Sequence, residues 1–74
     1  MLHPIQRYRI AKGWTQSELA RQVGVSVNTV QAWERGARIR PSNLIRLAAA
    51  LSVEPLTLLN EIEEWRDQNF RTRP

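Results

Sequence analysis

Glycine and proline divide this 74-residue chain into segments of the length of short helices. The glycines stand at positions 13, 24 and 36, and the prolines at positions 4, 41, 55 and 74. Within the segments apolar residues recur every three or four positions, and no segment alternates with a period of two for long enough to predict a strand. The chain is therefore predicted to be all-α, a compact bundle of five helices.

Capping residues mark the ends of these predicted helices. Thr15 and Glu18 have the spacing of a capping box, and Ser26 can cap the third helix. The helices are predicted at about residues 4–12, 15–23, 27–35, 42–51 and 55–69. Their expected inward-facing residues are Ile5, Tyr8, Leu19, Ala20, Val23, Val30, Trp33, Leu44, Leu47, Ala48, Leu51, Leu56, Leu59 and Ile62. His3, ahead of the first helix, is expected at a frayed end.

The composition excludes several classes of protein. There is no cysteine, which excludes disulfide frameworks, thiolate metal sites and cysteine nucleophiles. The longest apolar run, residues 47–51, is far shorter than the roughly 20 residues that span a bilayer. The first residues lack the pattern of a secretory signal. We therefore expect a soluble, cytoplasmic (nucleoid-associated) protein with no membrane partner.

Charge is distributed unevenly along the chain. Residues 1–52 carry eight cations and two anions, whereas residues 53–74 carry three cations and five anions. All but one of the cations are arginines, whose forked guanidinium suits contacts with phosphate or guanine. A basic first part with a more acidic end favours a polyanion-binding surface on the first part. An arginine-rich soluble surface with no such partner is the alternative.

The second and third predicted helices have the spacing of a helix-turn-helix. Only residues 24–26 separate them, and a glycine there can take the positive φ that the turn needs. The first helix of the pair needs a small residue where the second crosses it, and apolar residues must lock the two together. In a unit that begins at Gln16, positions 5, 9, 10, 15 and 18 hold Ala20, Gly24, Val25, Val30 and Trp33.

These residues, with their neighbours, resemble the lambda-repressor-like, Cro-type helix-turn-helix family, also called the XRE family. The resemblance covers about residues 4–60. It is carried by Ile5-x-x-Tyr8-Arg9, Lys12 to Ala20, Val23 to Ser26, Val30-x-x-Trp33-Glu34-Arg35-Gly36, Arg40-Pro41, Leu44-x-x-Leu47-Ala48-x-x-Leu51 and Val53-x-x-Leu56. It implies a five-helix DNA-binding domain over residues 1–60, followed by a C-terminal helical extension and tail over residues 61–74.

The resemblance also implies which residues meet double-stranded DNA. The third helix, residues 27–35, would lie in the major groove. Asn28 and Gln31 can read adenine, and Val27 or Ala32 can touch a thymine methyl. The expected base-reading residues are Ser26, Val27, Asn28, Gln31 and Ala32. For Asn28 the alternative is a solvated helix start.

Phosphates would be contacted on both sides of that helix. The start of the second helix offers free amides and a favourable dipole. The expected phosphate-contacting residues are Gln16, Ser17, Arg35, Arg38 and Arg40, with simple solvation as the alternative for each arginine. Arg9 and Glu34 match family positions that form a structural ion pair.

The chain departs from the family pattern near its end. Ser52 stands where the family often has glycine, and Glu54 stands where a serine or threonine cap is usual. Leu58, Ile62 and Trp65 share one helical face. Either Trp65 folds back onto the first helix, or these three residues form a contact with a second copy or another protein.

Two functions follow from these observations. The first is a sequence-specific transcriptional regulator that binds a palindromic operator as a homodimer. The alternative is an antitoxin or protein-interaction component whose tail binds a partner, with DNA binding for autoregulation. Catalysis has no support, since no HExxH, P-loop or GxGxxG pattern occurs. We therefore predict no enzyme, no cofactor and no bound metal.

Overall fold

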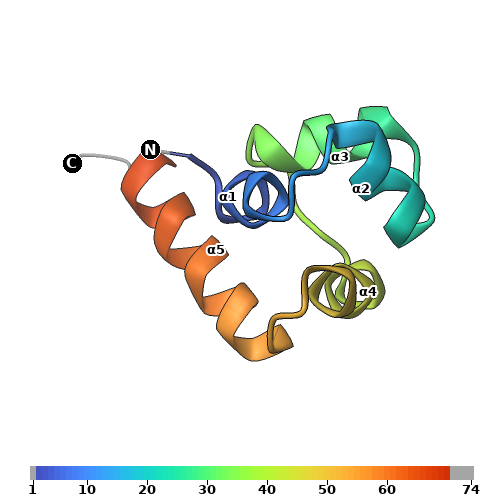
Figure 1. Ribbon diagram of the computed structural model, residues 1–74. Coiled ribbons are helices and arrows are strands. Elements are labelled where there is room, and N and C mark those ends of the chain that lie inside the picture. Colours follow the sequence, from blue (N-terminus) through green and yellow to red (C-terminus); the bar gives the residue numbers. More distant parts are fainter. Residues whose placement is uncertain (1, 71–74) are drawn as a thin grey trace.

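The computed structural model describes residues 2–70, and these residues form five α-helices and no strand (Figure 1). The helices are α1 (Pro4–Ala11), α2 (Gln16–Val23), α3 (Val27–Glu34), α4 (Pro41–Leu51) and α5 (Pro55–Phe70). The predicted all-α class and the five helices are confirmed. Positions 71–74 of the predicted tail lie outside the described residues.

Local capping interactions explain where α2 and α5 begin. The Thr15 hydroxyl accepts the amide of Glu18 at 3.1 Å, and the Glu18 carboxylate accepts the amide of Thr15 at 2.7 Å. These hydrogen bonds lower the pKa of the Glu18 carboxyl. Glu54 caps α5 by accepting the amides of Leu56 and Thr57 at 3.0 and 3.3 Å, so a carboxylate replaces the usual hydroxyl.

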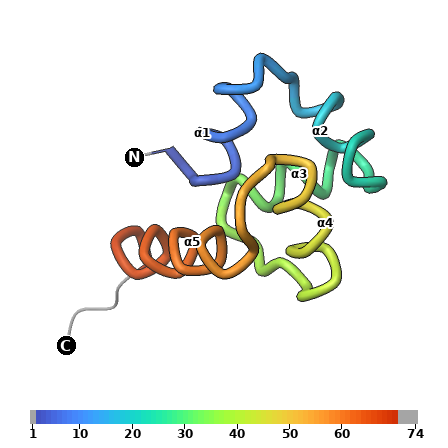
Figure 2. The backbone as a smooth tube through the Cα atoms, turned by 60° about the horizontal axis from the view of Figure 1, so that its bottom comes forward, coloured from blue at the N-terminus to red at the C-terminus, as the bar shows by residue number. Residues whose placement is uncertain are grey.

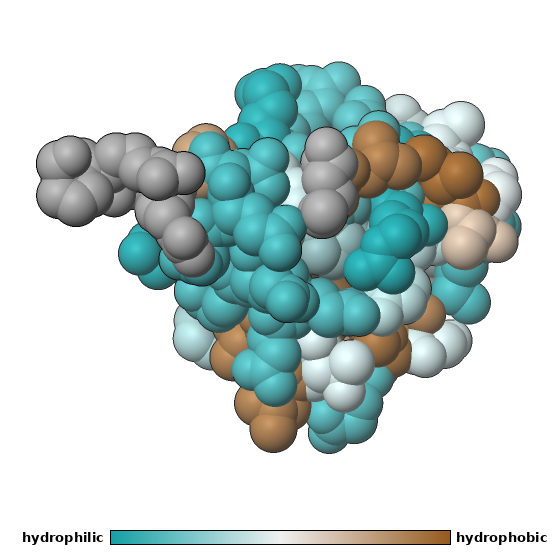
Figure 3. Space-filling view, turned by 90° about the vertical axis from the view of Figure 1, so that its left-hand side faces the viewer, coloured by the Kyte–Doolittle hydropathy of each residue, from teal (hydrophilic) through white to brown (hydrophobic). Residues whose placement is uncertain are grey.

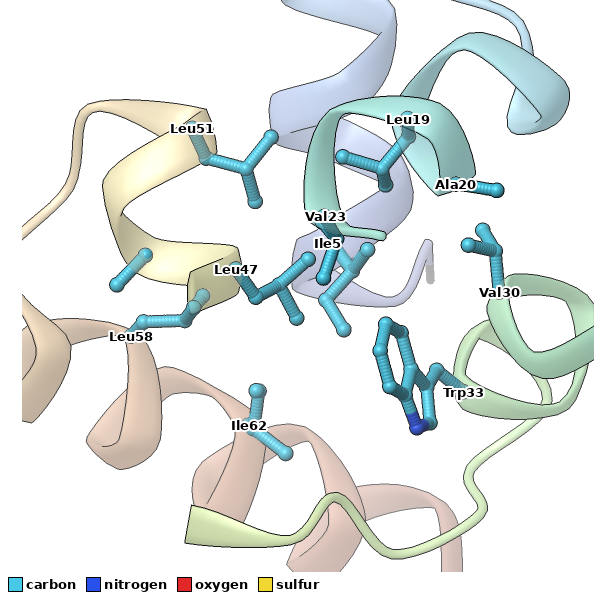
Figure 4. Packing of buried hydrophobic residues seen from close by; sticks show 11 residues of the cluster. Ile5, Leu19, Ala20, Val23, Val30, Trp33, Leu47, Leu51, Leu58 and Ile62 are labelled. Atoms are coloured by element: carbon cyan, nitrogen blue, oxygen red, sulfur yellow. The ribbon is translucent and has the colours of Figure 1, made fainter. Parts of the chain in front are cut away.

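The five helices enclose one core, to which each contributes (Figure 4). Figure 2 shows α5 on the opposite side of the bundle from α2. The core residues are Ile5, Leu19, Ala20, Val23, Val30, Trp33, Leu47, Ala48, Leu51, Leu58 and Ile62. The predicted inward faces of α2, α3 and most of α4 are therefore confirmed, and Leu44 packs against this core while partly exposed.

The predicted inner face of α5 is wrong at two positions. Leu56 and Leu59 are 61% and 37% exposed, whereas Leu58, Ile62 and Trp65 are buried. Residues spaced by four and three lie along one side of a helix, and Leu56 lies on nearly the opposite side from Leu58. Leucine at so many neighbouring positions left the choice of face to tertiary packing.

His3 is buried rather than frayed, with only 1% of its surface exposed. Its Nδ1 accepts the amide of Ile5 at 3.1 Å and so caps α1. Its ring meets the ring of Trp65 edge to face, with the centroids 4.6 Å apart. Burial lowers the pKa of His3 to about 4, because the charged imidazolium loses its hydration. A contact with α5 thus helps to hold His3 in its buried position.

Candidate nucleic-acid interface

The turn between α2 and α3 has the geometry that its sequence predicts. Gly24 adopts a left-handed conformation with φ of 88°, and its amide donates to the carbonyl of Ala20 at 2.8 Å. Ala20 is only 3% exposed, so α3 can cross α2 closely there. The Ser26 hydroxyl then accepts the amide of Thr29 at 3.2 Å and begins α3. The turn and the caps thus set the position of α3 relative to α2.

The exposed side of α3 presents the predicted base-reading residues unequally. Asn28 is exposed, and Ala32 lies one turn further along and is half-buried. Val27 is half-buried and packs against the core. Ser26 is exposed, but its hydroxyl is engaged in capping α3. Asn28 is therefore an exposed polar side chain of this set that, unlike Ser26, is not engaged in capping the helix.

Gln31, the remaining predicted base reader, belongs to a hydrogen-bonded network. Its Nε2 donates to Oε1 of Gln16 at 3.4 Å, and Nε2 of Gln16 donates to Oε1 of Glu34 at 2.9 Å. Gln16 was predicted to contact phosphate, and its side chain already bridges α2 to α3 in the free protein. This network holds the Gln31 amide at the surface in a defined orientation.

Glu34 and Arg9 complete the network below the surface. Nε of Arg9 lies 2.7 Å from Oε2 of Glu34, Nη2 donates to Oε1 at 3.2 Å, and Nη1 donates to the carbonyl of Trp14 at 2.9 Å. The two side chains are 11% and 5% exposed. The two residues that the sequence predicts to pair are thus in contact, and the forked pair fixes the end of α3 against α1.

The basic loop between α3 and α4 borders the exposed face of α3. Arg35, Arg38 and Arg40 are all exposed. A groove of about 470 Å³ lies between the loop and the helix. It is lined by Asn28, Thr29, Ala32, Trp33, Ala37, Arg38, Arg40 and Asn43.

Two of these lining residues, Thr29 and Asn43, were not identified from the sequence. Asn43 stands in the first turn of α4, and the path of the loop brings that turn beside α3. A polar residue just after a helix-opening proline was the available signal. The groove therefore adds neutral hydrogen-bonding groups to a surface otherwise dominated by arginine.

The three residues predicted as a possible dimer or partner contact are not available for one. Leu58, Ile62 and Trp65 are 0%, 3% and 8% exposed and pack inside the chain itself. The other interpretation, in which Trp65 folds back toward the first helix, agrees with its contact with His3. Figure 3 views the side where α5 ends, and hydrophilic residues cover most of that face. The predicted contact surface is absent because the indole of Trp65 packs against the rings of His3 and Phe70 within the chain.

The proposed boundary at residue 60 falls inside α5, whose second half packs on the same core as the first.

Among the described residues, no cluster of three or more histidine, cysteine or acidic side chains is arranged to hold a metal ion. Over the same residues, no helix combines the length and the apolar character needed to cross a bilayer.

Comparison with known proteins places this architecture. Residues 5–58 match a family model described as helix-turn-helix. The chain is 42% identical over 60 residues to a Neisseria hypothetical transcription factor from Neisseria meningitidis serogroup B, a match that covers 80% of the chain and 57% of that protein. It is 40% identical over 62 residues to the HTH-type transcriptional regulator SinR of Bacillus licheniformis, covering 81% of the chain and 56% of that protein. SinR of Bacillus subtilis is 39% identical over 62 residues, with the same coverage. The chain therefore spans a little over half the length of the curated relatives it matches.

Proposed function

The chain belongs to the lambda-repressor-like, Cro-type helix-turn-helix family, and from this premise we propose that it binds double-stranded DNA sequence-specifically as a transcriptional regulator. The observation that carries the proposal is the position of exposed Asn28 beside a groove bordered by Arg38 and Arg40. A polar reader flanked by cations matches a duplex, in which base edges lie between two phosphate ridges.

In this proposal α3 enters the major groove with its N-terminal half against the bases. Asn28 offers an amide that can bond adenine N6 and N7 together. Gln31 can do the same for a neighbouring base, since Gln16 already orients it. Val27 and Ala32 offer methyl groups to thymine, and Ser26 contributes through its position at the helix start.

Phosphates are contacted from both sides of α3 in this arrangement. Nε2 of Gln16 carries two hydrogens, and only one is needed for its bond to Glu34, so the second can reach a phosphate oxygen. Ser17 stands beside it in the first turn of α2, where the helix dipole favours an anion. On the other side, Arg35, Arg38 and Arg40 meet the facing backbone, with Asn43 as a neutral donor.

A second copy of the chain is part of the proposal, because one recognition helix reads only a few base pairs. We place its contact at Leu56 and Leu59, which are 61% and 37% exposed. Leu59 also lines a small groove with Ile39 and Leu44. An isologous contact through this surface would give a dimer with two-fold symmetry and a palindromic operator.

Selection of bound fragments from random duplex DNA at fixed salt tests the proposal. We expect a palindromic motif whose half-site centres lie about 10 base pairs, or a multiple of one helical turn, apart. In a low-salt NMR titration with duplex DNA, the amide signals of residues 27–32 should shift most. No enriched motif, together with unmoved signals in that stretch, would contradict sequence-specific binding.

The dimer has a separate test. Leu56→Asp places a charge on the proposed contact and leaves α3 untouched. The variant should lose cooperative binding to the full palindrome and retain the affinity of one protomer for an isolated half-site. Retention of cooperative binding would remove this contact from the proposal while leaving DNA recognition intact.

The structure does not favour the antitoxin alternative, because the apolar side chains of residues 61–65 are buried within the chain.

A further inference from the structure

We propose that the second half of α5, residues 61–70, clasps the C-terminal end of α3 and holds the following basic loop in its DNA-binding position, with Arg66 as a positioning residue. The inference rests on the proposed DNA-binding function. It concerns a part of the chain outside the helix-turn-helix match, which ends at residue 58.

The clasp is centred on Gly36, just beyond α3. The amide of Gly36 donates to the carbonyl of Trp33 at 3.0 Å, which closes the last turn of α3. The carbonyl of Gly36 accepts Nη1 of Arg66 at 2.7 Å. One buried residue therefore both ends the recognition helix and receives a charge-assisted hydrogen bond from α5.

Aromatic side chains of α5 pack close to the same turn. Gly36 has φ of 106°, and a Cβ atom placed there would lie 2.5 Å from Cε2 of Phe70 and 3.2 Å from Cζ3 of Trp65. The two aromatic rings meet edge to face with centroids 5.5 Å apart. The positive φ favours glycine here, and a Cβ atom would displace the Phe70 ring. Figure 4 shows the loop that follows α3 passing alongside α5.

The held turn lies among the residues that would meet phosphate. Arg35 directly precedes Gly36, and Arg38 and Arg40 follow it within the same loop. Glu34, the last residue of α3, stands two positions before Gly36 and is paired with Arg9 of α1. The end of α3 is thus held from two directions, by α1 through Glu34 and by α5 through Gly36. A loop that already has its binding conformation in the free protein loses less conformational entropy when it binds DNA.

Arg66→Gln tests the clasp, with Arg7→Gln as the matched control. Both changes remove one positive charge, but Arg7 is exposed and pairs with Glu61 at 3.7 Å on the α1 side of α5. Affinity for the selected palindrome and for unrelated duplex DNA is measured at several salt concentrations, well below the melting temperature. We expect Arg66→Gln to weaken both affinities by up to about tenfold, because DNA must then order a loop that this hydrogen bond to a charged group held in the free protein. Arg7→Gln should change them less than twofold.

Two further readouts separate positioning from a direct phosphate contact by Arg66. In the DNA-free protein, Arg66→Gln should shift the amide signals of residues 35–38 and speed their hydrogen exchange. Phe70→Ala removes no charge and changes only the last residue of α5. It should also weaken DNA binding and produce the same changes in the amide signals and hydrogen exchange of residues 35–38. A loss of affinity in Arg66→Gln with an unchanged loop, and wild-type behaviour of Phe70→Ala, would overturn the clasp.

Failure of the clasp and failure of the proposed function give different results. If the wild-type chain binds no duplex DNA, the proposed function fails first. If it binds and Arg66→Gln behaves like Arg7→Gln, only the clasp fails. Arg66→Lys keeps the positive charge and a hydrogen-bond donor, so it should recover part of the lost affinity. If Arg66 acted through its charge alone, the lysine variant would recover all of it.

Discussion

The Arg9–Glu34 pair is the residue-scale feature on which the proposed interface depends. Glu34 receives the guanidinium of Arg9 and the amide of Gln16 on the same carboxylate, so side chains from α1, α2 and α3 meet at one group. A carboxylate with this little exposure is stable only while its donors are present. Loss of either partner leaves an uncompensated charge.

Glu34→Ala should therefore destabilise the fold by about 3 kcal/mol, the cost of breaking a buried ion pair from one side. DNA binding should weaken for all sequences alike, because the carboxylate sets the angle of α3 and contacts no base. Urea denaturation and binding to operator variants measure the two effects. Glu34→Gln, which keeps an acceptor, is the control and should fall between. A loss restricted to one operator base would show that Glu34 reads sequence instead.

His3 provides a second prediction at this scale, in the pH dependence of stability. Its pKa is about 4 in the folded chain, against 6.5 as the ordinary value. As pH falls from 6.5 to 4, the unfolded chain takes up the proton first, so folding stability should decline by at most about 1.4 kcal/mol per pH unit. Above pH 6.5 the imidazole is neutral in both states and contributes no slope.

His3→Asn checks this slope, because asparagine can cap α1 without titrating. Urea denaturation of both proteins is measured at pH 7.5, 6 and 5. The free energy of unfolding of the wild type should fall progressively below its value at pH 7.5. The variant should be nearly flat over the same range, which lies above the ordinary pKa of most carboxyls. Parallel curves for the two proteins would mean that His3 is hydrated in the folded chain.

Single residues differ in how far the sequence could anticipate them. Arg9 and Glu34 stand in a family motif, and Asn28 stands at the start of a clearly patterned helix, so their surroundings could be inferred. His3 and Trp65 lie near opposite ends of the described chain, and their contact depends on where α5 points after it leaves the core. Periodicity identifies the side of a helix that is buried but not the residue that covers it.

Helices were predicted closely at their ends and less well on their faces. Boundaries such as Gln16 and Pro55 follow from capping hydrogen bonds within a few residues, which are local in sequence. The buried side of α5 was predicted wrongly at Leu56 and Leu59, since two sets of apolar residues fitted a helical face equally well. The packing of α1 and α4 against α5 decided between them.

The end of α4 carries a local strain that the sequence indicated. Ser52, at a position where glycine is frequent in the family, adopts φ of 58°. A left-handed conformation costs a residue with a Cβ roughly 1–2 kcal/mol, and glycine avoids this cost. Glycine also raises the conformational entropy of the unfolded chain, which offsets part of the gain in stability. Ser52→Gly should therefore stabilise the protein by about 0.5–1 kcal/mol in urea denaturation.

Ser52→Ala is the control for this change. It keeps the strained conformation and removes only an exposed hydroxyl that accepts Nζ of Lys12 at 3.4 Å. It should leave stability within about 0.5 kcal/mol of wild type, as for surface substitutions in general. Equal stabilisation by alanine and glycine would show that the hydroxyl, rather than the backbone, is unfavourable at this position.

At the scale of the whole molecule, charge and architecture divide the chain in the same way. The cations of the loop between α3 and α4 are exposed beside α3, whereas α5 presents Glu63, Glu64 and Asp67 on its outer surface. Sequence counting predicted the imbalance, but not that the loop would border a groove shared with Asn43. That juxtaposition depends on the packing of α4 beside α3.

This division predicts how DNA binding depends on salt. If Arg35, Arg38 and Arg40 each neutralise one phosphate, a dimer releases counterions from about six contacts, and the logarithm of the affinity should fall with the logarithm of salt with a slope of about −5. Arg38→Gln removes one contact per protomer and should reduce the steepness by about 2. Arg7→Gln, with the same charge change on the α1 side of α5, should leave the slope unaltered. Equal slopes for the two variants would mean that long-range charge, rather than phosphate contacts of this loop, governs the affinity.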